Sequence, residues 1–267
     1  MNKESRLQEA YLSRLEKQRR KIMAARILLA LAFFLLWETA ADRGWIDSFF
    51  FSSPSRLGRL FLSMWRDGSL FLHVGITLTE TLVSFALVVV IGLAVSLLLW
   101  LSDSVFQVLE PYLVILNSLP KSALAPLLIV WLGANSRTII VAGRSVAIFG
   151  TILNLYTGFT ETSREKIRLI YTLHGTKKDA LTKVVLPSTV PMIISIMKVN
   201  IGLCLVGVVI GEFIGARNGL GYLIIYGSQV FQLDLVILSI LILCLMAMLL
   251  YGGVTAAEKL YHRRQHA

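Results

Sequence analysis

Ionisable side chains inside long apolar segments are the residues of this chain that could do chemistry. Lys121, Arg144 and Lys198 lie in three such segments, and an ion at the centre of a bilayer costs about 2.5–3.5 kcal/mol even on lenient insertion scales. Lys121 also lies between Pro120 and Pro126, which interrupt its segment. Lys121, Arg144 and the two prolines are therefore candidates for a pathway that carries an anionic solute. The alternative is that the cations reach the membrane surface or pair with carboxylates.

Small residues form a second pattern around an acidic side chain. Gly207, Gly211 and Gly215 recur at every fourth position, and Glu212 lies among them. Small residues at this spacing let two helices approach closely within a membrane. One interpretation is the packing of spans. The other is a contact around a gate, with Gly219-Leu220-Gly221 turning the chain back into the membrane.

The chain has no catalytic or nucleotide-binding motif. Its sequence contains no G-x-x-x-x-G-K-[ST], G-x-S-x-G, H-E-x-x-H or Cys-x-x-Cys. Catalysis, a metal site and a cofactor site are therefore not expected in this polypeptide. If the chain moves a solute, the energy has to come from elsewhere.

Composition limits the class of protein to which the chain can belong. It has 267 residues, of which 56% are hydrophobic, and a mean hydropathy of +0.72. These values indicate a multi-span membrane protein embedded in a lipid bilayer. The net charge of +10 would suggest nucleic acid binding in a soluble protein. Here the better interpretation is that the positive charges orient the chain in the bilayer, so no nucleic acid partner is expected.

The apolar segments predict an all-α integral membrane fold with about six transmembrane helices. Each segment is long enough to cross about 30 Å of hydrocarbon as a helix. The third is irregular because of its prolines, and broken helices are tolerated where they line a cavity or pack inside protein. Residues 51–75 are different, and they predict an amphipathic helix at the far surface. The predicted spans cover residues 27–44, 76–101, 108–132, 138–159, 190–214 and 232–253.

Lysine and arginine gather in residues 1–26, 160–189 and 254–267. This distribution places both termini and the central loop in the cytoplasm. The expected organisation is a basic N-terminal segment, a first span with an outer amphipathic segment, a core of the remaining spans and a basic tail. The N-terminal segment is either a helix lying on the surface or a partly disordered tail. The expected boundaries are 1–26, 27–75, 76–253 with the loop at 160–189, and 254–267.

The central loop, Glu161–Pro191, predicts two short helices around a turn. Ile167, Ile170, Tyr171 and His174 follow the spacing of one helical face. The loop either docks a soluble partner on this apolar face or turns the face toward lipid.

The sequence also suggests how the helices of the loop begin and end. Gly175 can take the left-handed conformation that ends a helix. Thr176 and Asp179 have the spacing of a capping box for the second helix. Leu186-Pro187 is expected to stop that helix, because the residue before proline is pushed out of the α region.

Several stretches resemble the permease subunits of bacterial ATP-binding-cassette importers. Val184-Val185-Leu186-Pro187 matches the end of the "EAA" loop of that family, which places His174 at the position where the family has Gly. Gly211–Ile224, Asn117–Leu127 with Trp131-Leu132-Gly133, and Phe51–Ser55 are similar to the nitrate, sulfonate and taurine branch of the family. These pieces follow one another in the order and at the spacing of that family, so the resemblance extends over residues 30–260.

The resemblance implies a MetI-like core whose cytoplasmic two-helix loop couples to an ATPase. It implies a homodimer of permeases, two ATPase subunits that bind the ATP, and an external solute-binding protein, all at the bacterial inner membrane. It also implies a small solute, such as a sulfonate, taurine, nitrate or a vitamin precursor. A secondary carrier acting alone is the alternative, although no internal repeat is visible. The predicted docking residues are Ile167, Ile170, Tyr171, Leu173, His174, Gly175, Thr176, Leu186 and Pro187.

Overall fold

The computed structural model describes the backbone of residues 3–265 and the side chains of residues 17–261 and 263. The regular elements within that range are all helical. In chain order they are α1 (Lys3–Asp42), α2 (Ser48–Phe51), α3 (Pro54–Arg66), α4 (Ser69–Leu101), α5 (Asp103–Ser118), α6 (Lys121–Leu132), α7 (Ser136–Thr160), α8 (Arg164–Thr172), α9 (Lys177–Ala180), the π-helix η1 (Leu181–Val185), α10 (Leu186–Gly215), α11 (Leu220–Gln229) and α12 (Leu233–Gln265).

The helices confirm the predicted all-α membrane fold. Five helices in the described range are long and apolar enough to cross a membrane, and the pair α5 and α6 makes a sixth if it counts as one span. That pair is bent by 94°. The bend lies between Ser118 and Lys121, whereas Pro111 and Pro126 are accommodated inside helices. The irregular third span was therefore correctly predicted, and only Pro120 lies at its break.

The chain divides into two compact units, Met1–Ser63 and Met64–Ala267. In the first unit, α1 runs without a break through the described part of the basic segment and the first span. This part is helical rather than disordered, and one continuous helix joins it to the first span. At the other end of α1, a carboxyl oxygen of Glu38 accepts a hydrogen bond from the Ser55 amide in the first turn of α3 (2.9 Å).

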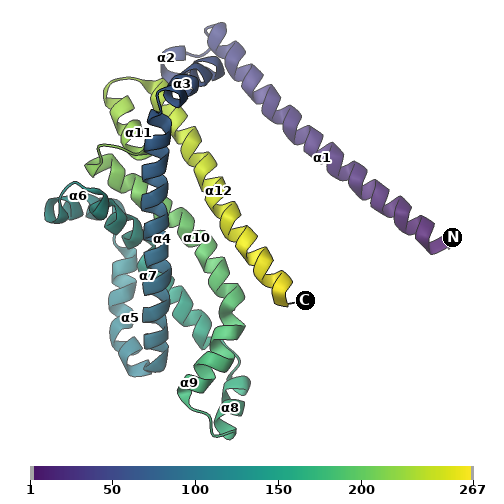
Figure 1. Ribbon diagram of the computed structural model, residues 1–267, viewed down its shortest axis with the longest axis vertical. Coiled ribbons are helices and arrows are strands. Elements are labelled where there is room, and N and C mark those ends of the chain that lie inside the picture. Colours follow the sequence, from purple (N-terminus) through teal and green to yellow (C-terminus); the bar gives the residue numbers. More distant parts are fainter. Residues whose placement is uncertain (1–2, 266–267) are drawn as a thin grey trace. The chain divides into compact units, whose positions relative to one another are not determined.

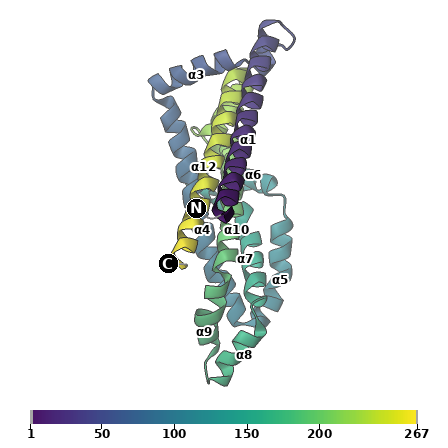
Figure 2. The ribbon, with the colours of Figure 1, turned by 90° about the vertical axis from the view of Figure 1, so that its right-hand side faces the viewer.

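The second unit is a bundle with α7 at its centre. α7 packs against α4 and α10 along its length, and α5 and α6 also contact it. Helices α8 and α9 lie at one end of this bundle, below α7 and α10 (Figures 1 and 2). Helix α11 lies at the opposite end, where α10 ends and α12 begins (Figure 1).

Helix α4 shows why this sequence packs as a membrane bundle. It begins at Ser69, seven residues before the predicted span, directly after Gly68, whose φ is +79°. Its outward side chains are large and apolar, such as Val90 and Leu98, each 65% exposed. Its buried side chains are mostly small or polar, because close helix approach in lipid depends on small residues and hydrogen bonds. The small and polar ones are His73, Thr77, Glu80, Thr81, Ser84, Gly92 and Ser96.

Candidate functional site

The central loop folds as two helices around a turn, as predicted. The Ser163 side chain caps the start of α8 by accepting a hydrogen bond from the Lys166 amide. In the second helix, the Thr176 side chain accepts from the Asp179 amide (3.2 Å) and Asp179 accepts from the Thr176 amide (2.9 Å). The predicted capping box is thus confirmed.

The turn after α8 is made by His174 rather than Gly175. His174 has φ +60°, and its amide donates to the carbonyl of Tyr171 (3.0 Å). The Gly175 amide donates to the carbonyl of Ile170 (2.8 Å), which completes a Schellman motif with His174 in the left-handed position. The prediction for Gly175 was therefore wrong. Glycine is needed there for a different reason, because a Cβ would lie 2.9 Å from the Ile170 carbonyl oxygen.

The apolar residues of α8 divide between two faces. Ile167 and Ile170 are half-buried and pack on a core cluster that includes Phe159, Leu181 and Val185. Of the predicted face, these two isoleucines are half-buried, whereas Tyr171 is exposed and His174 lies beyond the end of α8.

The remaining apolar side chains of this helix and its turn point outward. Leu169, Tyr171 and Leu173 are 59%, 46% and 71% exposed, and His174 is exposed beside them. Only these side chains of the loop's apolar set remain available to a partner on this side of α8.

The helix that follows Thr176 does not stop at Leu186-Pro187, as predicted. Residues 177–215 form one helix of 39 residues in which Leu181–Val185 is π-helical. Leu186 keeps helical angles (φ −57°, ψ −51°), and Pro187 falls in the first turn of α10. A proline is tolerated in the first turn of a helix. The wider π-helical turn before it changes the i→i−4 ladder that a proline would otherwise break.

Lys177 attaches the loop to the ends of two spans. Its Nζ lies 5.4 Å from the centre of the Trp100 ring on α4. It also lies 3.7 Å from a carboxyl oxygen of Asp103, the first residue of α5. The loop is therefore anchored to α4 and α5 as well as to α10.

A buried polar cluster lies at the opposite end of the bundle, around Glu212. This residue is 1% exposed, and both of its carboxyl oxygens accept hydrogen bonds. The Thr77 hydroxyl donates to one (2.6 Å), and the Gly221 amide donates to the other (2.6 Å). Two further amides are held by α4: that of Leu220 donates to Thr77 Oγ1 (2.8 Å), and that of Gly219 donates to His73 Nδ1 (3.0 Å). Glu212 thus fixes the loop between α10 and α11.

The predicted glycine pattern divides into two roles. A Cβ on Gly207 would lie 2.9 Å from the Gly143 backbone, and one on Gly211 would lie 3.3 Å from the Ile139 backbone. A Cβ on Gly215 would lie 2.6 Å from the end of the Ile129 side chain. These three glycines therefore let α10 pack closely on α7 and α6.

Gly219 and Gly221 instead make room for the Glu212 carboxylate. Gly219 has φ +113°, and a Cβ there would collide with Glu212 Oε1. A Cβ on Gly221 would lie 2.7 Å from Oε2 of the same carboxylate.

The predicted pathway residues are not brought into one cluster. Lys121 begins α6 after Pro120, and its Nζ donates to the carbonyl of Asn117 across the bend. Pro126 lies within α6 and is exposed. Arg144 is half-buried on α7, and none of the ion pairs within residues 17–261 involves it. Lys198 pairs with Glu258 of α12, as the alternative interpretation predicted.

Two members of the cluster around Glu212, His73 and Thr77, were missed at the level of sequence. The pattern that could have found them is polar residues at helical spacing in an apolar segment. His73, Thr77, Glu80, Thr81 and Ser84 lie on one face of α4. In a membrane span, such a face is expected to be buried against other helices.

The chain matches a known family over residues 88–265, described as the binding-protein-dependent transport system inner membrane component. It is 30% identical over 237 residues to a probable ABC transporter permease protein of Haemophilus influenzae, covering 89% of this chain and 95% of that protein. It is 27% identical to a formylaminopyrimidine transport permease protein of Halalkalibacterium halodurans (87% and 92% covered). It is 24% identical to a taurine transport system permease protein of Escherichia coli (84% and 83% covered).

Solved structures have the same fold. A methionine ABC transporter in an inward-facing conformation aligns with TM-score 0.60 and 20% identity, covering 69% of this chain and 92% of that chain. An amino acid ABC transporter aligns with TM-score 0.55 and 18% identity, covering 76% and 98%. The family is one of transport permeases rather than enzymes, and it does not favour a carrier that acts alone. The chain therefore belongs to the family of binding-protein-dependent transport system inner membrane components, as a permease subunit of an ATP-binding-cassette importer.

Proposed function

We propose that two copies of this permease form the pathway for a small solute, driven by two ATPase subunits. An ATPase and a solute-binding protein are the partners that the family implies. Each copy uses the loop at residues 160–189 to dock one ATPase, which binds the ATP. The binding protein delivers the solute at the opposite side of a bacterial inner membrane.

The division of α8 into two faces is the observation that carries the proposal. Ile167 and Ile170 hold the helix on the core, while Leu169, Tyr171 and Leu173 remain exposed. Exposed aromatic and aliphatic side chains on a firmly held helix fit a groove on a soluble partner. His174, Gly175 and Thr176 set the turn that presents them, and Leu186 and Pro187 continue the loop into α10.

The orientation follows from the same loop. With α8 and α9 in the cytoplasm, both termini are cytoplasmic and the basic residues of the tail lie inside. The Glu212 cluster then lies at the outer end, where α10 ends and α7 begins. In this orientation, the proposed domain organisation is a core at residues 76–253 between basic segments at residues 1–26 and 254–267.

The solute is a small organic or inorganic molecule. Relatives of the chain carry names that include formylaminopyrimidine, taurine and aliphatic sulfonates. Lys121 and Arg144 are candidates for contact with an anionic group of such a solute, with Pro120 and Pro126 shaping the bent span. The alternative for Lys121 is the structural role that its bond to the Asn117 carbonyl suggests.

The docking proposal is tested with Leu173→Asp in the assembled importer. Leu173 is 71% exposed, so a charge there leaves the fold intact but disfavours an apolar contact. We expect recovery of the ATPase with tagged permease to fall at least about tenfold, the loss of about 1.4 kcal/mol. Leu260→Asp is the matched control, because Leu260 is 62% exposed on the tail of α12. Equal recovery with both variants would contradict the proposal.

A further inference from the structure

Glu80 lies beside the cluster around Glu212, but its carboxyl group is bonded differently from the groups of that cluster. It is 3% exposed, and neither of its carboxyl oxygens has a hydrogen-bond partner among the described residues. Its neighbour Glu212 has both oxygens bonded, and His73 accepts from the Gly219 amide. The network next to Glu80 is thus satisfied, while Glu80 itself is left with unused acceptors.

A buried carboxyl group without partners is expensive in a membrane protein. Leaving a buried charged acceptor unsatisfied costs more than leaving an ordinary polar group unsatisfied. The surroundings of Glu80 hold two features that bear on this. Ser136, the first residue of α7, lies beside it, so the N-terminus of that helix faces the carboxylate. The Glu212 carboxyl is also close enough to interact with it.

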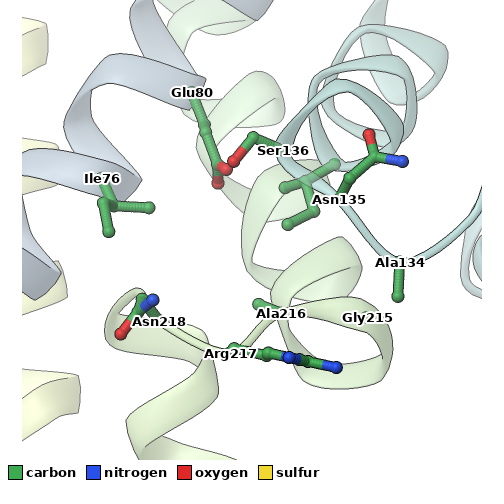
Figure 3. A pocket seen from close by; sticks show the side chains of 10 residues that line it. Ile76, Glu80, Ala134, Asn135, Ser136, Gly215, Ala216, Arg217 and Asn218 are labelled. Atoms are coloured by element: carbon green, nitrogen blue, oxygen red, sulfur yellow. The ribbon is translucent and has the colours of Figure 1, made fainter.

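The Glu80 side chain points into a cavity of about 160 Å³. Figure 3 shows Glu80 and Ser136 pointing toward one another, with Arg217 and Asn218 on the opposite side of the space. Asn135, Ser136, Arg217 and Asn218 are all exposed, so the cavity opens at the surface. It therefore presents a buried acceptor at one wall and a guanidinium near its mouth.

We propose that this cavity is a selectivity subsite for the amine-bearing end of a small solute. Glu80 accepts hydrogen bonds from the N–H groups of that end, and Arg217 meets an anionic end at the mouth. The substrate class is then an amino-bearing or zwitterionic small molecule rather than a simple inorganic anion. This inference rests on the proposed transport function for its substrate, but the charge and chemistry of the cavity can be measured without transport.

The charge is tested by labelling a cysteine in the wall of the cavity. The starting protein carries Cys204→Ala and Cys244→Ala, which remove both native thiols. Asn218→Cys is then added, because Asn218 lines the cavity and is exposed. We expect a cationic 2-aminoethyl methanethiosulfonate to react faster than the anionic 2-sulfonatoethyl reagent. Glu80→Gln should lower that ratio about fivefold at low salt, the effect of one nearby unit charge.

A second cysteine position serves as the control for labelling. Ser228 is exposed on α11 and does not line the cavity. With Ser228→Cys, the ratio of the two rates should not change on Glu80→Gln. An unchanged ratio at residue 218 would overturn the proposal, and so would an equal change at both positions.

The chemistry of recognition is tested by protection from labelling. Methylammonium carries N–H donors, whereas tetramethylammonium has the same charge and none. We expect methylammonium to slow labelling of Asn218→Cys more than tetramethylammonium does, and Glu80→Gln should abolish the difference. Equal protection by both ions, or no protection by either, would overturn the subsite.

Uptake of solute is measured separately from cysteine labelling, so the two proposals can fail independently. Absence of ATP-driven uptake by the assembled importer would contradict the proposed function and leave the labelling result standing. Normal uptake without a role of Glu80 in labelling would contradict only the subsite.

Discussion

Glu212 holds the loop between α10 and α11 in place through both of its carboxyl oxygens. Thr77 and the Gly221 amide supply the donors, and glycine at 219 leaves the space that the carboxylate occupies. A polar side chain can be retained in a bundle of this kind because both of its own carboxyl oxygens are hydrogen-bonded. The loop between α10 and α11 is therefore specified by the fit of a few atoms.

We expect Gly219→Ala to destabilise the protein strongly. Its φ of +113° is strained for any other residue, and the added Cβ would collide with Glu212. Backbone strain of this kind costs about 1–3 kcal/mol, before the loss of the hydrogen bonds is counted. Thermal unfolding in detergent, followed by the fraction that stays monodisperse, measures the effect. Gly202→Ala is the control, because a Cβ at Gly202 meets nothing within 4 Å and should be tolerated.

The sequence identified Glu212 and its glycines but could not place their partners. The spacing of Gly207, Gly211 and Gly215 is a local pattern, so it could be interpreted without a structure. The bond from Thr77 joins residues 135 positions apart in the chain. No local pattern reports such a contact, and His73 and Thr77 were missed for that reason.

Helix α8 ends in a turn where a histidine stands in the left-handed position. The hydrogen bonds from His174 and Gly175 to Tyr171 and Ile170 fix that turn. A residue with a Cβ carries about 1 kcal/mol of strain in this conformation, which glycine does not. The apolar pattern predicted the helix correctly. Which residue takes the left-handed conformation at its end could not be predicted, because that depends on the close approach of Gly175 to Ile170.

His174→Gly should therefore stabilise the loop by about 1 kcal/mol. Gly175→Ala should have the opposite effect, because its Cβ would lie 2.9 Å from the Ile170 carbonyl oxygen. Hydrogen exchange of the α8 amides compares the two variants at the level of the loop. Slower exchange in Gly175→Ala than in His174→Gly would contradict this account of the turn.

The described spans carry many large apolar side chains outward, while their buried surfaces combine large apolar residues such as Phe159 and Leu155 with small and polar ones. This arrangement follows from lipid as the solvent, and it made the spans predictable from hydropathy alone. The starts and ends of helices were harder to predict. α4 begins seven residues early, and α9 continues through Leu186-Pro187, because tertiary packing and a π-helical turn override local signals.

The proposed orientation predicts which residues are reached from outside intact cells. In the protein without native cysteines, Asn218→Cys should react with a membrane-impermeant maleimide. Thr182→Cys, exposed in the loop that we place inside, should react only after the cells are opened. Labelling of Thr182→Cys in intact cells would reverse the orientation.

The unbroken helix from residue 177 to residue 215 has a mechanical consequence. At about 1.5 Å per residue, its 39 residues span about 58 Å, from the loop at residues 160–189 to the wall of the cavity beside Glu80. A helix that is continuous over this length transmits a displacement at one end toward the other, and the places where it can bend are its π-helical turn at Leu181–Val185 and Pro191. A tilt imposed on α9 would therefore be passed along the helix to Gly215. In the proposed importer, the opening of the cavity would then be coupled to the nucleotide-driven movement of the loop at residues 160–189.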